Sequence, residues 1–286
     1  MSAQQYEIAL YLVHPKAKTM MTNQTQPGPI TLSPTYPDLA GKVAVVTGGS
    51  RGIGAAICRA LAANRVKLVV NGRDQAAIDA VLETIWDNGG QAIGIAADVT
   101  DFAAIETLRQ QTEEQLGPVD VVVAVAGGYG EPVSTVDTTA DQWRFVVDAN
   151  LTATFLTLKS FLPSMIERRC GSLITISSTA GRIASNSSAA YAAAKAGIVM
   201  LTRHLANEIG KQGVRVNCLA PGAILTEHSG LQRAPEQVRQ QVAALHPLGR
   251  IGTPEDVAQA ALFLASDSSA WLTGLTLDVA GGRVML

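Results

Sequence analysis

The chain has 286 residues, 47% of them hydrophobic, and its 24 acidic and 22 basic residues give a formal net charge of −2 at pH 7. This length and apolar content can build a sizeable core, and α/β proteins of this length often form one domain. The small net charge gives no electrostatic reason to expect nucleic acid or a membrane as a partner. Cys58, Cys170 and Cys218 are widely spaced and odd in number, which argues against disulfides and predicts apolar fillers in a cytoplasmic protein.

Residues 1–40 differ in composition from the rest of the chain. Thr, Ser and Gln separate the prolines of this segment, which are Pro15, Pro27, Pro29, Pro34 and Pro37. Such a composition cannot bury enough apolar surface to build a core of its own. We therefore expect a flexible N-terminal arm over 1–40 and one folded domain over 41–286.

Apolar runs and helical segments alternate along that domain. Most of the runs lack polar alternation, as in strands that are buried on both faces of a parallel sheet. Strands are expected at 42–47, 66–71, 91–96, 119–125, 171–177, 214–219 and 275–279. Helices are expected at 53–64, 74–88, 101–116, 139–163, 189–211 and 254–266. This order predicts an α/β fold, a single-domain doubly wound Rossmann fold with a seven-stranded, mainly parallel sheet, helices on both faces, and ligands beyond the carboxyl ends of the strands.

A glycine-rich turn, Thr47–Gly54, follows the strand-like run Val43–Val46 and precedes a segment with helical periodicity. Strand, glycine turn and helix are the context that a dinucleotide-binding fingerprint requires. Gly48 permits the tight turn, and the later glycines let the backbone approach a pyrophosphate at the positive N-terminus of the helix. By itself the turn is a weak indication, because many glycine turns are ordinary surface turns.

A second motif lies far downstream, in Tyr191-Ala-Ala-Ala-Lys195, with Ser178 placed 13 residues before the tyrosine. Residues four apart share one face of a helix, so the phenol and the ammonium are expected side by side. A nearby cation lowers the pKa of a phenol toward the range in which it transfers protons to a carbonyl oxygen. Ser178 ends a strand-like run, where its hydroxyl is expected to hold a substrate oxygen. Alone, the pair would more often be a packed tyrosine and a solvated lysine; the glycine turn favours the catalytic interpretation.

With both motifs in place, the sequence resembles the short-chain dehydrogenase/reductase family over about 40–286. The matched elements follow the family order: the glycine turn, Asp98, Asn150, Ser178, the Tyr191/Lys195 pair, Pro221-Gly222 with Thr226, and Asp278–Gly282. The resemblance implies an enzyme that interconverts a ketone and a secondary alcohol, with 41–286 as its dinucleotide-binding catalytic domain. A non-catalytic nucleotide-sensing protein on the same fold is the remote alternative, since fold does not fix function.

The resemblance also implies a role for each matched residue. Tyr191 would be the general acid/base, and Lys195 would hold the nicotinamide ribose and lower the pKa of that tyrosine. Ser178 would orient the carbonyl, and Asn150 would fix a water in the proton relay. Asp98 would contact the adenine, and Ile224 with Thr226 the carboxamide end. The expected cofactor contacts are Gly48, Ser50, Arg51, Gly52, Ile53, Gly54, Arg73, Asp98, Val99, Ala126, Gly127, Tyr191, Lys195, Pro221, Gly222, Ile224 and Thr226.

The chain departs from the family pattern after the fourth strand. The family usually has Asn-Asn-Ala-Gly there, whereas this chain has Ala124-Val125-Ala126-Gly127. The Ala-Gly that approaches the cofactor is kept, but the asparagine side chains that brace the neighbouring strands are not. The departure bears on stability and cofactor affinity and removes no catalytic group.

Two arginines predict a preference for NADP(H), with NAD(H) as a possible second cofactor. NAD-specific sites usually place an acid at the end of the second strand, where this chain has Gly72. Arg51 in the glycine turn and Arg73 are expected to hold a 2′-phosphate, because arginine recognises phosphate well. Asp74 is explained as the N-cap of the next helix. Solvated surface arginines are the alternative.

The substrate is the least determined part of the prediction. The expected pocket borders are Tyr129–Val133, Ala180–Ala190 and a substrate loop over 223–245. The chain looks most like the 3-oxoacyl-carrier-protein reductase branch, so Arg168 and Arg169 are candidates for docking an acidic carrier. The position of the second docking arginine holds Gln212, which leaves that case incomplete. A generic secondary-alcohol, sugar or steroid dehydrogenase is the alternative.

Two further expectations concern metals and assembly. No metal site is expected, because His14, His204, His228 and His246 lack metal-ligand spacing, and the last two are expected at the surface. A homotetramer is expected from the resemblance and from apolar C-terminal segments that a monomer would leave exposed. These segments are Leu262–Leu264, Trp271-Leu272 and Val284–Leu286.

Overall fold

A computed structural model describes residues 34–130, 133–227 and 229–286 of the chain. Seven strands form one sheet in the order β3-β2-β1-β4-β5-β6-β7, with all neighbours parallel, which confirms the expected doubly wound fold. The strands are β1 Val43–Thr47, β2 Lys67–Gly72, β3 Gln91–Ala96, β4 Val121–Ala124, β5 Gly171–Ile176, β6 Val214–Pro221 and β7 Thr276–Val279. The helices are α2 Gly52–Ala63, α3 Gln75–Asp87, α4 Phe102–Leu116, α5 Ala140–Val147, α6 Ala153–Arg168, α7 Ala189–Ile209, α8 Glu236–Ala244 and α9 Pro254–Ala265.

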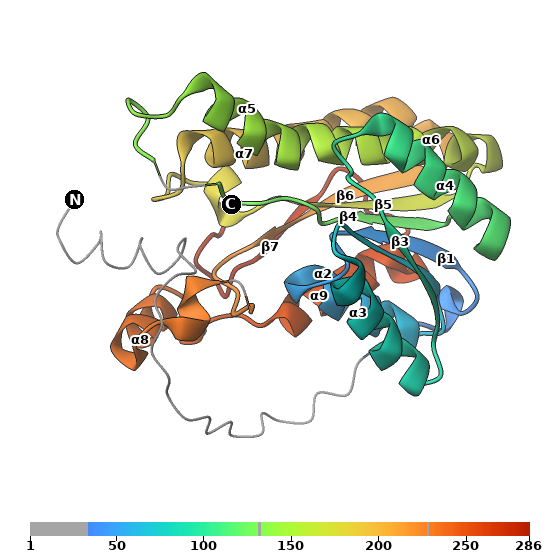
Figure 1. Ribbon diagram of the computed structural model, residues 1–286, viewed down its shortest axis with the longest axis horizontal. Helices are drawn as coiled ribbons and strands as arrows, with labels where there is room; N and C mark the ends of the chain where they lie inside the picture. The colour runs from blue at the N-terminus through green and yellow to red at the C-terminus, as the bar shows by residue number, and fades with distance from the viewer. Residues whose placement is uncertain (1–33, 131–132, 228) are drawn as a thin grey trace.

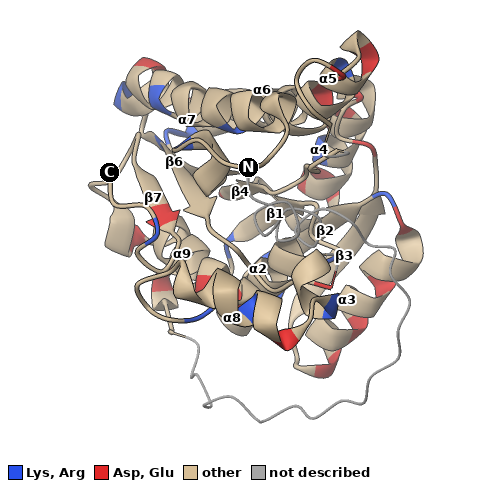
Figure 2. Ribbon diagram, turned by 90° about the vertical axis from the view of Figure 1, so that its left-hand side faces the viewer, with Lys and Arg blue, Asp and Glu red and all other residues tan. Residues whose placement is uncertain are grey.

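The two faces of the sheet carry separate apolar cores. Along β1, Ala44 and Val46 belong to one core and Val43 and Val45 to the other, as the two-residue period of a strand requires. Helices α2, α3 and α9 cover the first face, and α4, α6 and α7 cover the second (Figure 1). Acidic and basic residues are intermixed on the outer helices in Figure 2, in keeping with the small net charge.

The helical segment from α5 to α6 is interrupted by a turn of π-helix at Asp148–Thr152. The sequence predicted one helix over 139–163, and the observed segment continues to Arg168. By length and composition it could cross a membrane, with a mean hydropathy of 1.2 over its most apolar window. Leu158, Phe161 and Met165 are instead buried in the core beneath it, so we assign a core helix.

Helix boundaries follow local capping chemistry. Asp74 accepts a hydrogen bond from the Ala77 backbone and caps α3, as expected. Thr253 and Asp256 form a capping box at the start of α9, with Pro254 in the first helical position. The expected loop over 223–245 contains a helical element that the sequence analysis missed, the 3₁₀ turn Gly230–Arg233 followed by α8.

Residues 34–40 pack on the domain, so the expected arm ends earlier than predicted. Leu39 is fully buried in the core beside α2 and α9. The Tyr36 backbone donates to Asn64, and the Asp38 carboxylate accepts from the Asp267 backbone at 2.8 Å. Residues 1–33 lie outside the described residues.

Three further expectations about single residues were wrong. Leu262 and Leu264 are fully buried within the chain and offer no assembly surface, whereas Trp271 is 98% exposed. Cys58 and Cys218 are buried fillers as expected, but Cys170 is exposed. His246 is buried rather than on the surface, while His228 lies outside the described residues.

Candidate active site

One cavity of about 260 Å³ gathers most of the predicted site residues. It lies beyond the carboxyl ends of β1, β4, β5 and β6, where the strand order of a doubly wound sheet reverses. Its walls include Gly48, Arg51, Gly52, Ile53, Gly54, Ala126, Gly127, Asn150, Ser178, Tyr191, Lys195, Pro221, Gly222, Ile224 and Thr226. Ser50, Arg73, Asp98 and Val99, which were also expected to contact the cofactor, are not among its lining residues.

Two glycines explain how the backbone segments come so close together. A Cβ on Gly54 would lie 2.1 Å from the carbonyl oxygen of Gly48, so only glycine allows α2 to start against this turn. A Cβ on Gly127 would lie 2.5 Å from the Asn150 Oδ1 and 3.5 Å from the Lys195 Nζ. The space that these missing side chains leave is a cradle beside a helix N-terminus, as a dinucleotide requires. The residues present therefore fit a dinucleotide.

The N-terminus of α2 already holds an anion of the protein itself. The Gly52 N–H donates to the Glu227 carboxylate at 3.1 Å, and Thr226 lies against the same glycine. The neighbouring Arg51 pairs with Asp74. Both positive groups of this turn thus contact carboxylates, which shows that the turn favours negative charge. The sequence analysis did not anticipate Glu227, although it lies within the expected substrate loop.

Asn150 is buried within the π-helical turn between α5 and α6. Its Nδ2 donates to the Gly128 and Val146 carbonyls at 2.8 Å each, and its Oδ1 accepts from the Gly128 N–H at 3.3 Å. These bonds tie α5 to the segment that follows β4. They support that segment in a chain that has lost the two family asparagines, and π turns of this kind are frequent at functional sites.

Tyr191 is buried near the start of α7, which Ser188 caps by accepting from the Tyr191 N–H. Burial raises the pKa of Tyr191 well above its usual value, the neighbouring Tyr129 raises it further, and a hydrogen bond with Ser178 opposes the rise. The sequence analysis expected Lys195 to lower the pKa of Tyr191, but Lys195 is not among the groups that shift it. Ser178 follows β5, where its Oγ accepts from the Ala180 N–H at 3.1 Å.

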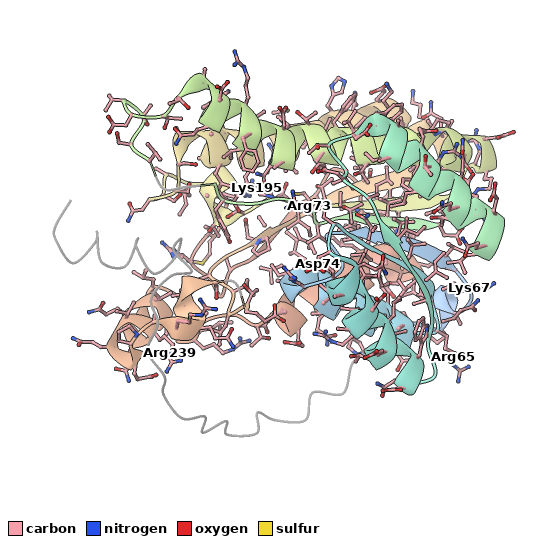
Figure 3. All side chains as sticks on the ribbon, viewed as in Figure 1. Arg65, Lys67, Arg73, Asp74, Lys195 and Arg239 are labelled. Carbon is pink, nitrogen blue, oxygen red and sulfur yellow. The ribbon has the colours of Figure 1, made fainter. Side chains whose placement is uncertain are left out.

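Lys195 is buried one helical turn beyond Tyr191 on α7. Figure 3 marks the position of Lys195. Its Nζ donates to the Ile176 carbonyl at 2.9 Å and lies 5.6 Å from the centre of the Tyr191 ring. Ser177 in turn donates to the Lys195 carbonyl at 2.7 Å, so α7 is fastened to the end of β5. Burial lowers the pKa of Lys195 to about 8, against a smaller opposing effect of Cys218.

Tyr129 forms part of the cavity wall, at the pocket border where the sequence placed it. Its contact with Tyr191 was not anticipated. The two ring centres are 4.7 Å apart at an interplanar angle of 39°. Tyr129 is 56% exposed overall, yet its hydroxyl end is buried and its pKa is raised by that burial. The tyrosine therefore presents one face to solvent at the mouth of the site.

The remaining cofactor candidates lie around the carboxyl end of β2. Arg73 is exposed and stands 4.0 Å from the Asp98 carboxylate, whose pKa is lowered mainly by the Thr100 N–H. A Cβ on Gly72 would lie 2.7 Å from the Ser50 hydroxyl, so Ser50 covers the position where NAD-specific sites place an acid. Val99 is buried beside Asp98.

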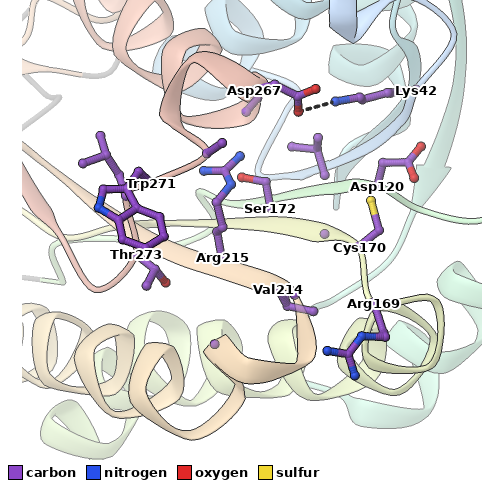
Figure 4. A pocket seen from close by; sticks show the side chains of 17 residues that line it. Lys42, Asp120, Arg169, Cys170, Ser172, Val214, Arg215, Asp267, Trp271 and Thr273 are labelled. Atoms are coloured by element: carbon purple, nitrogen blue, oxygen red, sulfur yellow. Dashed lines mark hydrogen bonds and ion pairs between the residues drawn. The ribbon is translucent and has the colours of Figure 1, made fainter.

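The proposed docking arginines lie at the amino end of β5, whereas the catalytic cavity lies beyond its carboxyl end. Arg168 pairs with Asp120 at 3.0 Å and serves the fold rather than a docking surface. Arg169 precedes β5 while Ser178 follows it, and it lines a separate cavity with Arg215 and Trp271 (Figure 4). Neither arginine therefore borders the catalytic cavity.

Histidines and acids do not form a metal centre in the described ranges. No group of three or more His, Cys, Asp or Glu side chains there is arranged to hold a metal ion. His246 is buried, and its Nδ1 is hydrogen-bonded to the Val242 carbonyl at 2.9 Å. Its Nε2 lies close to Gly222 and has no hydrogen-bond partner among the described residues.

Known proteins share this arrangement over almost the whole domain. A family model described as enoyl-(acyl carrier protein) reductase matches residues 48–283. Glucose 1-dehydrogenase 2 of Bacillus subtilis (strain 168) is 37% identical over 252 residues, 87% of this chain and 97% of the relative. The 3-oxoacyl-[acyl-carrier-protein] reductase of Synechocystis sp. (strain ATCC 27184 / PCC 6803 / Kazusa) is 39% identical over 249 residues, 86% of this chain and 98% of the relative.

A solved structure gives the same result. The 3-oxoacyl-[acyl-carrier protein] reductase with bound NAD from Brucella melitensis superposes with a TM-score of 0.81 at 35% identity, covering 93% of this chain and 99% of that chain. These similarities cover the glycine turn, Ser178, Tyr191 and Lys195 together. The chain belongs to the short-chain dehydrogenase/reductase family and is an oxidoreductase.

Proposed function

We propose that this chain is an NADP(H)-dependent reductase that converts a ketone to a secondary alcohol, with 3-oxoacyl thioesters as its substrate class. The observation that carries the proposal is the single cavity that joins Tyr191, Ser178, Asn150 and Lys195 to the glycine turn. The relatives named as 3-oxoacyl-carrier-protein reductases support the substrate class.

The chemistry follows from the groups around Tyr191. When bound, the reduced nicotinamide supplies the hydride for the carbonyl carbon. Tyr191 donates the proton to the carbonyl oxygen, and the Ser178 hydroxyl donates a hydrogen bond that orients that oxygen. Lys195 holds the nicotinamide ribose, and Asn150 fixes the Gly128 backbone at the floor of the site. The remaining cofactor contacts are those predicted from the sequence, with the pyrophosphate at the N-terminus of α2.

The protonation state of Tyr191 suits the role of proton donor in ketone reduction. Burial and Tyr129 hold its pKa well above the usual value, so the phenol is protonated at neutral pH. A protonated phenol is the form that donates to a carbonyl, whereas alcohol oxidation requires the phenolate.

NADP(H) preference rests on Arg73, which is exposed at the end of β2 with no acid at Gly72. Arg51 is the weaker of the two candidates because Asp74 already pairs with it. NAD(H) use is the alternative, and the Brucella melitensis relative with bound NAD favours testing it.

A sugar substrate is the second candidate, because a glucose 1-dehydrogenase is among the similar proteins.

We also propose that the enzyme is a cytoplasmic homotetramer, for which the exposed Trp271, Met285 and Leu286 supply apolar surface.

The test is an absorbance assay of NADPH and NADH consumption. The purified full chain is offered acetoacetyl N-acetylcysteamine thioester, and glucose oxidation is measured with NADP⁺ and NAD⁺. Thioester reduction with NADPH supports the proposal. Glucose oxidation without thioester reduction would contradict the proposed substrate class and indicate a sugar dehydrogenase.

A further inference from the structure

A second cavity adjoins the catalytic one on the side of α5. It has a volume of about 450 Å³, which lies within the usual range of small-molecule sites. Its lining residues are Gly130, Val133, Thr138, Asp141, Gln142, Phe145, Val146, Ser188 and Ala190. We name it the α5 cavity. Gly130, Val133, Ser188 and Ala190 belong to the pocket borders expected from the sequence, whereas none of these lining residues comes from the third expected border, the loop over 223–245.

The α5 cavity and the catalytic cavity share a wall. Gly130 directly follows Tyr129, and Ala190 directly precedes Tyr191. Val146 packs with Ala190 and Tyr191 in one buried cluster. A molecule whose carbonyl reaches the Tyr191 hydroxyl therefore has this cavity as its nearest large space on the α5 side.

The side chains that line the α5 cavity favour apolar ligands over polar ones. Phe145, Val146, Val133 and Ala190 line the cavity with carbon, and Phe145 is 65% exposed although it is a large apolar side chain. The polar side chains of the lining already have partners within the protein. Gln142 is engaged with Thr139 in the capping box of α5, Thr138 donates to the Ser134 carbonyl, Asp141 pairs with Arg144, and Ser188 accepts from the Tyr191 N–H. Among the described residues, no lysine or arginine lines this cavity. Such a wall stabilises alkyl groups and leaves most sugar hydroxyls without partners.

Tyr129 lines the catalytic cavity at the point where the chain continues into the wall of the α5 cavity. Its ring contacts Tyr191, and the next residue, Gly130, lines the α5 cavity. The half-exposed aromatic face offers apolar area at the carbon atoms next to the reacting carbonyl.

We propose that the α5 cavity binds the apolar chain of the substrate, with Tyr129 as the specificity-determining edge between chain and carbonyl. The enzyme thus selects ketones that carry an alkyl chain over polyhydroxylated ones. This inference rests on the proposed function, because it assumes that Tyr191 protonates a ketone.

The experiment uses a chain-length series of N-acetylcysteamine thioesters: 3-oxobutanoyl, 3-oxohexanoyl and 3-oxooctanoyl. Each buried methylene is expected to raise kcat/KM about fourfold, hence about fifteenfold for each two-carbon step, until the cavity is filled. The kcat for the shortest substrate reports the chemical step without a chain in the cavity.

Three variants locate the chain. Phe145→Ala removes part of the α5 cavity wall and should lower kcat/KM for the 3-oxooctanoyl substrate about fivefold, with less than a twofold change for 3-oxobutanoyl. Val133→Phe fills the cavity and should flatten the series. Phe155→Ala is the matched control, because it removes another half-exposed phenylalanine from the same helical segment, outside the α5 cavity.

The outcomes separate this inference from the proposed function. A series that is flat in the wild type, or one that keeps its full slope in both Phe145→Ala and Val133→Phe, overturns the inference and leaves ketone reduction in place. Failure of the wild type to reduce any member of the series overturns the proposed function itself. A slope that survives in Phe155→Ala and falls in Phe145→Ala and Val133→Phe supports the assignment.

Discussion

The two ends of the catalytic cavity differ in what their polar groups contact. At the catalytic end, Asn150 and Lys195 bond to backbone carbonyls and are held in place by the fold. At the phosphate end, the Gly52 N–H and Arg51 contact the carboxylates of Glu227 and Asp74. In the proposed binding mode a dinucleotide would bring negative charge to those same groups, so its binding would require an exchange of partners there and none at the catalytic end. The catalytic side chains are thus positioned before a cofactor binds, whereas Glu227 and Asp74 would compete with the phosphates of the cofactor.

The largest expected effect concerns the catalytic end. Tyr191→Phe removes only the transferable proton, so ketone reduction should fall by about 10²–10⁴-fold. The Kd for NADPH, measured by fluorescence titration, should stay within about twofold of the wild type. Near-normal turnover in this variant would contradict the role of Tyr191.

The pH dependence reports Lys195. Its pKa is lowered to about 8 by burial, so the ammonium loses its proton as the pH rises through that value in the free enzyme. kcat/KM for NADPH reflects the free enzyme and the free cofactor, whose 2′-phosphate titrates at about pH 6. It should therefore be nearly constant from about pH 7 to 8 and fall about tenfold per pH unit above pH 8. Tyr191 does not interfere, since its pKa lies well above 10.

Lys195→Arg is the control for that profile. An arginine keeps its charge over the whole range, so the decline above pH 8 should disappear even if the absolute rate is lower. A wild-type profile that stays flat to pH 9.5 would show that the charge of Lys195 is unimportant.

The phosphate end is tested first at its outer edge. Arg73→Ala should raise the KM for NADPH about tenfold and leave the KM for NADH unchanged, because only NADPH has a 2′-phosphate. Arg51→Ala should have the smaller effect, since Asp74 already pairs with that guanidinium. Equal effects of Arg73→Ala on both cofactors would mean that Arg73 is a surface charge. Gly72→Asp is a poorer test, because its side chain would crowd Ser50.

Glu227 tests the exchange of partners directly. Glu227→Gln keeps the size of the side chain and removes its charge from the N-terminus of α2. Two like charges about 4 Å apart in water repel by about 1 kcal/mol, so the Kd for NADPH should fall about fivefold. Glu114→Gln, an equal charge change on α4, should leave the Kd unaltered. A Kd that is unchanged or higher in Glu227→Gln would show that the carboxylate does not compete with the phosphates.

The sequence predicted the catalytic end better than the phosphate end, for a physical reason. Strand ends, helix caps and the Tyr191/Lys195 spacing are local patterns, so Ser178 and the start of α9 could be placed from neighbouring residues. The Glu227 contact joins positions 175 residues apart and depends on how one loop crosses the site. The π turn at Asn150 and helix α8 were missed because apolar periodicity does not reveal a change in helix type or a short polar helix.

The smallest expected effect concerns the N-terminal segment. Removing residues 1–33 should leave the thermal midpoint and turnover within error of the full chain, because the composition of that segment cannot build a core. Removing residues 1–39 is the contrasting variant. It takes away Leu39, which is fully buried, and the Asp38 contact with Asp267. Losing a buried leucine costs about 2–3 kcal/mol, which lowers the midpoint by about 5–10 °C in a domain of this size. Equal midpoints for the two truncations would show that residues 34–39 add nothing to stability, and a large loss on removing 1–33 would show that the segment packs on the domain or on a neighbouring subunit.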